Sequence, residues 1–564
     1  MARRTIAVLA LTVVLAAAAC TPAPRLVETP VTSPVTDQVD TREVVVGVSS
    51  VAGGYNPHQI TDQSAITTAL ANLVLPSVFR SGPDGIPRLD RTVMSSATVT
   101  SYDPYTVTYR IRSDASWSDT APVAAEDFVY LWQQVTDSPG AIDAAGYRLI
   151  SDINARDAGK VVEVVFAQPY PGWRSLFTNL LPAHLLKDAP GGWDGALQTN
   201  FPATAGPYAV KALDTDRGEI VLERSDRYWE EPPVLDRIVL RRADQSGIVD
   251  ALDAGHDQLA LARMDAVGVD LVGELSPAVP TRTVPRPSVS TLVIRPDRPQ
   301  LTELLVRQAI VALLDRDQLV TAGTGTGPAA ALRADAQVLA PSLPGYRSTV
   351  PTAAGTATPA RHDPALAEQL LTQAGYTRAS SGWVRDGQPL DIVVGAAEER
   401  EPARRIAEDV RRQLVAAGIA TEVLTLPADE LYGQLSDTGG NTGDANTLDL
   451  AVISQPVGGD QATTLATNFG CAASGEDGQR SAANPLGFCD PAIQPTMDAA
   501  LSGALSVTDA LAAVEPILWR AAVSVPLFQE AETLAVRPEV SNVSLGPPLV
   551  GPFAGATAWR RAAG

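Results

Sequence analysis

The chain has 564 residues, of which 45% are hydrophobic and 19% are charged. This length is too great for one ordinary hydrophobic core and predicts two or three structural units. The formal charge of −21 at pH 7 would repel a phosphate backbone, so the composition argues against a nucleic-acid partner.

The first 20 residues have the layout of a secretory signal peptide. Arg3 and Arg4 give a positive start, residues 6–19 are almost entirely apolar, and four alanines precede Cys20. The apolar run has 14 residues, below the roughly 18–20 that a transmembrane helix needs. A membrane-anchor helix is the alternative interpretation of the same run.

Cys20, placed directly after small residues, resembles the lipidated cysteine of a bacterial lipobox, although Ala17 stands where that motif usually has Leu. The resemblance implies that residues 1–19 are removed and that Cys20 carries two acyl chains. Two chains suffice to anchor a protein stably, here to the outer face of the cell membrane. Residues 20–42 are rich in Pro and Thr, and we expect them to form an extended tether.

Strand patterns begin at Glu43. Val44–Val48 is an apolar run suited to a buried strand, and residues 105–111 alternate apolar and polar side chains with period two. Shorter runs predict further strands at residues 161–166, 220–223, 238–240, 291–294, 390–394 and 448–453.

Helix patterns are clearer in the second half of the chain. Residues 305–313 place apolar side chains on one helical face. Asp363 and Gly375 are suited to begin and end a second helix, and a third apolar stripe over residues 406–414 stops at Gly418. Helices that each lead toward a strand predict a mixed or parallel sheet covered by helices.

Cys471 and Cys489 are the two cysteines left if Cys20 is lipidated. An exported protein is folded in an oxidising compartment, so these two predict a disulfide. Closing a loop of about 19 residues would stabilise the chain by roughly 3 kcal/mol. A thiol or zinc site is the alternative, which the lack of a neighbouring histidine disfavours.

Several segments, in chain order, resemble family 5 of the extracellular solute-binding proteins, the peptide- and nickel-binding receptors of ABC importers. They include an early Asn-Pro element, a strand followed by Trp-Ser-Asp and a helix, a Tyr-Trp hairpin and an Arg-x-Ala helix. These segments are Tyr55–Pro57 and residues 105–133, 181–184, 205–210, 222–241, 306–320, 362–376, 404–423 and 525–530.

The resemblance implies an α/β fold with two lobes, of the periplasmic-binding-protein type (type II, cluster C), with mixed sheets. Lobe I would span residues 43–290, with an inserted subdomain at about 61–205. Lobe II would span residues 291–530, and residues 531–564 would return to lobe I. Two chain crossings, near residues 286–295 and 525–534, would form the hinge, and ligand would bind between the lobes.

Residues 454–471 pose the question of cargo. Peptide receptors of the resembled family carry an aromatic and then an acidic residue here, and the acid pairs with the peptide's α-amino group. This chain has Gln455 and Gly458-Gly459 where the aromatic is expected and keeps only Asp460, which can also be an ordinary loop residue. The residues nominated for ligand binding are Tyr55, Asn56, Gln455, Asp460 and Asn468.

Two hypotheses for the ligand follow. The first is an oligopeptide or similar solute delivered to ABC permease and ATPase subunits. The second comes from the segments NFGCA and NPLGFCDPAI, which resemble the LpqW-like lipoproteins of this family. That branch is associated with binding an acylated phosphatidylinositol mannoside and with regulating lipomannan and lipoarabinomannan synthesis. In both cases we expect a monomer.

The sequence offers no catalytic motif. Residues 323–328, GTGTGP, lack the Lys-Ser/Thr of a phosphate-binding loop and predict a turn. The four histidines are far apart, and no nucleophile elbow is present. We therefore predict no enzymatic activity, no metal and no cofactor.

Overall fold

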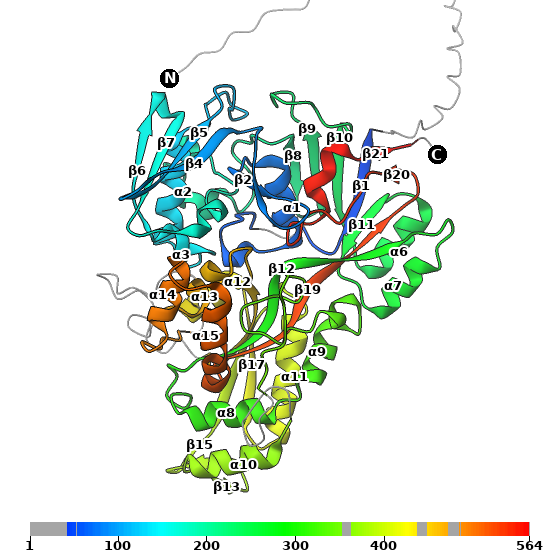
Figure 1. Ribbon diagram of the computed structural model, residues 1–564. Coiled ribbons are helices and arrows are strands. Elements are labelled where there is room, and N and C mark those ends of the chain that lie inside the picture. The colour runs from blue at the N-terminus through cyan, green and yellow to red at the C-terminus, as the bar shows by residue number, and fades with distance from the viewer. Residues whose placement is uncertain are drawn as a thin grey trace, which may run out of the picture. The chain divides into compact units, whose positions relative to one another are not determined.

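The computed structural model describes residues 42–51, 54–351, 362–436, 448–471, 484 and 487–562 (Figure 1). The predicted signal peptide, Cys20 and the tether up to residue 41 lie outside the described residues. Among the residues described, no helix is both long enough and apolar enough to cross a membrane.

A mixed sheet of ten strands runs through the described chain in the order β17-β16-β18-β12-β19-β11-β1-β10-β9-β8. β1 pairs in parallel with β10 and β11, and β16 pairs in parallel with β17 and β18, whereas the other pairs are antiparallel. The predicted α/β class with mixed sheets is therefore confirmed. The strands are β1 (Glu43–Val48), β8 (Tyr208–Asp214), β9 (Glu219–Arg224), β10 (Arg237–Arg242), β11 (Leu259–Ala262), β12 (Thr281–Ile294), β16 (Asp391–Ala397), β17 (Ala420–Leu426), β18 (Leu450–Pro456) and β19 (Ser524–Val536).

Two long strands, β12 and β19, join the halves of this sheet (Figure 1). We call β11, β1, β10, β9 and β8 with their covering segments lobe I, and β18, β16 and β17 with theirs lobe II. The register of β12 on β19 shifts between Pro285 and Val289, where β12 leaves lobe I and begins to pair with β18. A register shift bends a strand pair locally, so the strands change direction where the two lobes meet.

The chain between β1 and β8, residues 54–207 in the described part, forms a separate four-stranded sheet in the order β4-β5-β7-β6, and we call it the insert. The predicted period-two strand is β5, whose Tyr105, Val107, Tyr109 and Ile111 are buried. The strands are β4 (Met94–Tyr102), β5 (Tyr105–Ile111), β6 (Ile150–Arg156) and β7 (Val161–Phe166), and the helices are α1 (Ala65–Val74), α2 (Ala125–Asp137), α3 (Ala144–Tyr147), α4 (Ala183–Leu186) and α5 (Gly192–Ala196).

The helices predicted in the second half are present. Asp363 accepts a hydrogen bond from the backbone N–H of Leu366 at 3.0 Å and so begins α10, and Gly375 follows that helix with φ of 87°. Residues 406–414 lie in α11 with their apolar side chains buried. The helices of lobe II are α8 (Leu304–Leu313), α9 (Arg316–Thr324), α10 (Pro364–Gln373), α11 (Ala403–Ala416), α12 (Ala428–Ser436), α13 (Gln461–Phe469), α14 (Gln494–Leu501) and α15 (Val507–Ala521).

The remaining elements are short or lie at the edges. They are the helices α6 (Gln245–Ala254) and α7 (Ala266–Gly273), the strands β2 (Phe79–Ser81), β3 (Pro87–Leu89), β13 (Thr377–Ala379), β14 (Gly382–Arg385), β15 (Gln388–Pro389), β20 (Val540–Ser541) and β21 (Arg560–Arg561), and the 3₁₀ turns η1 (Ile60–Asp62), η2 (Asp157–Gly159), η3 (Pro171–Ser175), η4 (Pro328–Ala331) and η5 (Pro552–Ala558). The glycine-rich residues 323–328 end α9 and lead into η4, as the turn prediction requires.

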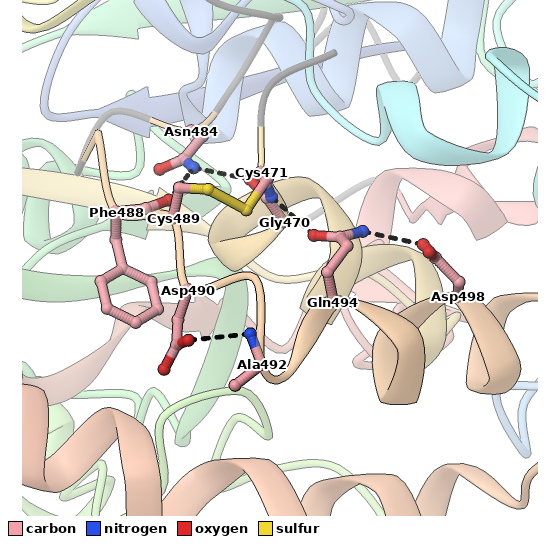
Figure 2. Close-up of a disulfide and its surroundings, with 9 residues drawn as sticks. All are labelled: Gly470, Cys471, Asn484, Phe488, Cys489, Asp490, Ala492, Gln494 and Asp498. Atoms are coloured by element: carbon pink, nitrogen blue, oxygen red, sulfur yellow. Dashed lines mark hydrogen bonds between the residues drawn. A yellow bond between two sulfur atoms is a disulfide. The ribbon is translucent and has the colours of Figure 1, made fainter.

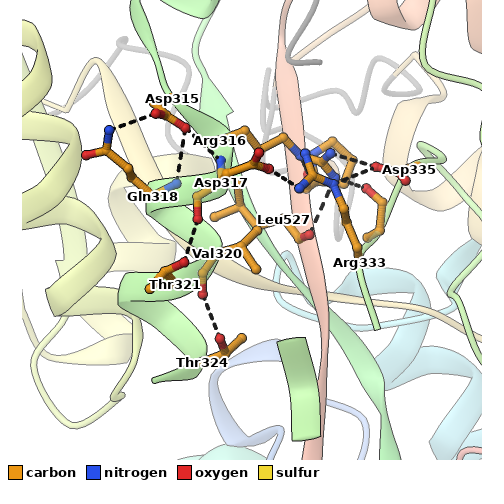
Figure 3. Close-up of polar contacts among 12 residues, drawn as sticks. Asp315, Arg316, Asp317, Gln318, Val320, Thr321, Thr324, Arg333, Asp335 and Leu527 are labelled. Carbon is orange, nitrogen blue, oxygen red and sulfur yellow. Dashed lines mark hydrogen bonds and ion pairs between the residues drawn. The ribbon is translucent and has the colours of Figure 1, made fainter. Parts of the chain in front are cut away.

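A buried arginine ties α9 to β19 (Figure 3). Arg316 is only 3% exposed, and its Nε donates to the carbonyl of Pro526 at 2.8 Å. Its Nη1 lies 2.6 Å from Asp335 Oδ1, and Arg333 contacts the same carboxylate at 3.2 Å. The guanidinium therefore joins α9 to backbone acceptors of β19.

Cys471 and Cys489 are joined in the structure, with their sulfur atoms 2.05 Å apart (Figure 2). Asn484 donates from Nδ2 to the carbonyls of Gly470 and Phe488, at 2.8 Å each. The backbone N–H of Cys471 donates to Gln494 Oε1 at 2.7 Å. These contacts hold the cystine between the end of α13 and the start of α14.

Candidate ligand-binding cleft

A cavity of about 1010 Å³, here cavity 1, lies where the insert, the C-terminal segment and lobe II meet. The insert contributes α1 and β2, the C-terminal segment contributes residues 544–557, and lobe II contributes Pro456–Gly459. Its volume is at the upper end of the roughly 300–1,000 Å³ typical of small-molecule sites. The cavity can therefore hold a large solute.

The lining of cavity 1 is mostly uncharged. The insert contributes most of the hydroxyl and amide side chains, and both the insert and the C-terminal segment contribute apolar ones. Arg80 and Asp90 neutralise one another through a 2.6 Å contact between Nε and Oδ2. The uncharged polar residues include Asn72, Thr92, Ser175, Thr178 and Asn179, and the apolar residues include Phe79, Leu545, Leu549 and Val550.

Asp460, the nominated ammonium partner, is engaged by the protein itself. Its Oδ2 accepts from the hydroxyl of Tyr170, in the insert, at 3.1 Å, and from the hydroxyl of Thr463 at 2.6 Å. Tyr170 is fully buried. The Asp460 carboxylate joins lobe II to the insert and is not among the groups that line cavity 1.

Asp143 is the carboxylate that does line cavity 1 near this contact. Burial and the neighbouring charge of Asp460 raise the pKa of Asp143 to about 6. Asp143 has φ of 52°, and an added Cβ on Gly458 would lie 3.1 Å from its Oδ1. Sequence reasoning missed this residue, because nothing in the local pattern at 143 indicates a partner in lobe II.

Tyr55 and Asn56 are buried and shape a turn. The Tyr55 hydroxyl donates to the carbonyl of Val51 at 2.6 Å. The backbone N–H of Asn56 donates to Asp62 Oδ2 at 2.9 Å, and Asn56 Oδ1 accepts from the N–H of His58 at 3.0 Å. Neither residue is among those that line cavity 1 or the second cavity described below, so their contacts hold the chain that leads into η1.

Gln455 and Asn468 are also buried, next to the lining and not part of it. Gln455 lies on β18 opposite Val289 of β12 and is 3% exposed. Asn468 donates from Nδ2 to the carbonyl of Pro456 at 3.2 Å and so supports the segment 456–459. That segment, and not the nominated side chains, is what lobe II presents to cavity 1.

A second cavity of about 380 Å³, here cavity 2, lies between the lobes where β12 and β19 cross. It is lined by three arginines and five acids: Arg263, Arg286, Arg400, Asp62, Glu399, Glu401, Glu530 and Glu532. Arg286 Nη1 lies 3.0 Å from Glu530 Oε2. Burial acts to raise the pKa of the Glu530 carboxyl, but the charge of Arg286 and the hydroxyl of Ser454 bring it below its usual value.

A sequence signal for cavity 2 exists. Glu530 and Glu532 are two positions apart in strand β19, which is buried over all but its last residue. Because side chains two apart in a strand share a face, two acids at this spacing in a buried strand indicate a polar site on that face.

Two lobes joined by a pair of crossing strands, with cavities between them, define a two-lobed solute-binding protein of the periplasmic-binding-protein type. Residues 92–476 match the model of the "Bacterial extracellular solute-binding proteins, family 5 Middle". The chain belongs to this family, as its sequence motifs predict.

Relatives from mycobacteria are similar over nearly the whole chain. The "Probable monoacyl phosphatidylinositol tetramannoside-binding protein LpqW" of Mycobacterium tuberculosis is 34% identical over 593 aligned residues, covering 93% of this chain and 92% of that protein. The oligopeptide-binding protein OppA of Mycobacterium bovis is 25% identical and covers 86% of this chain and 80% of its own. The resemblance to the LpqW branch predicted from the sequence is therefore confirmed.

Solved structures confirm the fold. The oligopeptide-binding protein AppA of Bacillus subtilis, in complex with a nonapeptide, superposes with a TM-score of 0.74. It covers 92% of this chain and 99% of its own at 16% identity. At that identity the likeness is one of architecture.

Proposed function

We propose that this protein is a membrane-anchored extracytoplasmic lipoprotein that binds an acylated phosphatidylinositol mannoside in cavity 1. The observation that carries the proposal is the lining of that cavity, which combines uncharged hydroxyl and amide groups with apolar residues such as Leu545, Leu549 and Val550. Sugar hydroxyls need donors and acceptors, whereas an acyl chain needs apolar surface. The 34% identity to LpqW, a probable monoacyl phosphatidylinositol tetramannoside-binding protein, supports the same class of ligand.

The position of Asp460 adds support. A peptide receptor of the expected kind needs a free carboxylate for the α-amino group of its cargo, since a buried ammonium without a partner is costly. Here that carboxylate already accepts two hydrogen bonds from Tyr170 and Thr463. A ligand without a cationic end does not need it.

The test is a thermal-melting titration of the secreted chain carrying Cys20→Ser, with purified phosphatidylinositol mannosides and with mixed tri- to pentapeptides. A ligand at 100 times its Kd should add about 2.7 kcal/mol to the free energy of unfolding. We expect stabilisation by the mannolipid and none by the peptides. Stabilisation by the peptides alone would overturn the proposal.

Gly459 offers a selective block. It lines cavity 1, and a Cβ added to it meets no atom within 4 Å, so Gly459→Phe should fill cavity space with no clash at its Cβ. We expect this variant to melt like the unmodified chain and to lose mannolipid binding. Gly273→Phe is the matched control, because Gly273 is equally open but does not line the cavity.

A second candidate function is delivery of an oligopeptide to ABC permease and ATPase subunits, as OppA's name indicates for that protein. The observation in its favour is Asp143, whose carboxylate lines cavity 1 and can pair with an ammonium group. If this second function is correct, Asp143→Asn should abolish the stabilisation of the protein by peptides. Retention of peptide binding by that variant would exclude Asp143 as the ammonium partner.

Anchoring is proposed through Cys20, with the signal peptide ahead of it and the tether behind it. Metabolic labelling with a palmitate analogue should mark the wild-type protein and not Cys20→Ser, which should appear in the medium. Labelling of the variant would contradict the anchor. We also propose that the protein acts as a monomer and that it is not an enzyme.

A further inference from the structure

A small third cavity lies between cavity 2 and cavity 1. This third cavity, of about 20 Å³, shares Thr68 and Leu549 with cavity 1, and it shares Arg286 and Glu532 with cavity 2. The side chains between these two ends are mainly apolar, Phe553 among them. The two cavities are therefore neighbouring parts of one cleft, and cavity 2 is its charged end.

Most charged groups of cavity 2 already have protein partners. Arg263 of lobe I donates to the carbonyl of Glu401 in lobe II, and Arg400 of lobe II donates to the carbonyl of Thr61 in the insert. Glu530 accepts from Ser288 and from Arg286, at 3.0 Å each. These groups hold the lobes and the crossing strands together.

One atom of Arg286 and one of Glu532 are the exceptions, although Arg286 is paired with Glu530 through its Nη1. Arg286 Nη1 lies 3.8 Å from Glu532 Oε1, so the two side chains are neighbours. Within the described residues, Arg286 Nε and Glu532 Oε2 are buried without a hydrogen-bond partner. Glu532 is only 8% exposed, and both side chains line cavity 2. Buried polar groups are nearly always satisfied, so this pair is suited to a bound group that both donates and accepts hydrogen bonds.

The chemistry of that group follows from the pair. An ammonium would donate to Glu532 but has no lone pair for Arg286 Nε. A phosphate or carboxylate would accept from Arg286 but would bring a negative charge against Glu530 and Glu532. A hydroxyl donates one hydrogen bond and accepts others, so it satisfies both atoms.

We propose that cavity 2 is a subsite for an uncharged, hydroxyl-rich group, a sugar or polyol, which donates to Glu532 Oε2 and accepts from Arg286 Nε. Its volume of about 380 Å³ lies within the usual range for small-molecule sites. Assigning this subsite to the sugar end of the mannolipid rests on the proposed function. The subsite itself rests on the two unpaired atoms.

The experiment is isothermal titration of the secreted Cys20→Ser chain with mannobiose, butylammonium and inorganic phosphate. We expect mannobiose to bind and the two ions not to bind. Glu532→Gln should weaken mannobiose binding at least about tenfold, because one charge-assisted hydrogen bond is lost. Glu398→Gln is the matched control, since Glu398 is exposed and does not line the cavity, and it should leave binding unchanged.

If Glu532→Gln does not melt cooperatively, Glu532→Asp takes its place, because it keeps the charge but withdraws the oxygen from the ligand. Absence of mannobiose binding, preference for either ion, or equal affinity in the variant and the parent would overturn the subsite and leave water as its occupant. If the mannolipid binds equally well to Glu532→Gln and to the parent, the subsite is overturned and the proposed function stands. If mannobiose binds in a way that depends on Glu532 but the mannolipid does not bind, the subsite stands and the proposed function is overturned.

Discussion

Tyr170 and Asp460 are 290 positions apart in the chain, and the tyrosine hydroxyl donates to the aspartate Oδ2 at 3.1 Å. The contact joins η3 of the insert to the start of α13 in lobe II. Because the Tyr170 side chain is buried, the hydroxyl contributes to how firmly these two parts hold together.

Tyr170→Phe removes that hydroxyl and leaves Asp460 Oδ2 with Thr463 alone. We expect the free energy of unfolding to fall by about 1.5–3 kcal/mol, the usual effect of losing a hydrogen bond to a charged group. Urea unfolding monitored by circular dichroism measures it. Tyr102→Phe is the control, because Tyr102 is 81% exposed and should change nothing measurable. Equal losses in both variants would contradict a specific interlobe contact.

Asp143→Asn should stabilise the protein at neutral pH. The folded-state pKa of Asp143 is about 6, above the roughly 3.9 of an unfolded aspartate. The folded protein therefore binds the proton more tightly, and this contribution to stability is full below pH ~4 and is lost as pH rises through about 6. Asparagine removes the charge and tolerates the positive φ.

Unfolding in urea at pH 5 and pH 7.5 checks this. At pH 7.5 the variant should be more stable than the wild type by about 1 kcal/mol, and the difference should shrink at pH 5. Asp226→Asn, at an exposed position, controls for the change in net charge. A gain that is the same at both pH values would count against the linkage to Asp143.

Removing the cystine should destabilise lobe II. Cys471 and Cys489 are 18 positions apart, and a crosslink of that span contributes about 3 kcal/mol in the chain-entropy model. The double variant Cys471→Ser, Cys489→Ser should lose that amount in chemical unfolding. A reducing agent should lower the melting temperature of the parent and leave that of the double variant unchanged. Sensitivity of both to the reductant would point to another cause.

Arg316→Ala should be among the more damaging single substitutions. It removes the donor to the carbonyl of Pro526 and leaves the carboxylate of Asp335 with Arg333 alone. Figure 3 shows both arginines at this carboxylate. Because Asp335 is partly exposed, we expect a loss of about 3 kcal/mol, the low end for breaking a buried pair. Arg333→Ala, which removes a neighbouring and partly exposed arginine, should cost about 1 kcal/mol or less. Comparable losses in the two variants, measured by urea unfolding, would show that burial of Arg316 is not decisive.

Local sequence patterns were enough to predict several helices and strands and the family. The alternation over residues 105–111, the cap at Asp363 and the apolar stripe of α11 each reflect a period that the backbone geometry of strands or helices imposes on neighbouring residues. The family motifs also predicted the two-lobed fold. Their order along the chain can be recognised without knowing which residues they contact.

The binding cleft could not be predicted in the same way. Asp460 has the residue type of an ammonium partner, but only the packing of the insert shows that Tyr170 already occupies its carboxylate. Arg286 lies on β12 and Glu532 on β19, and almost the whole of lobe II separates these strands in the sequence. The two side chains become neighbours only when β12 and β19 pair. The sequence by itself determined the periodic elements and the membership of the family, since both depend on residue types in chain order. Only the tertiary structure decided which polar groups remain free to bind a ligand, because that depends on partners hundreds of residues away.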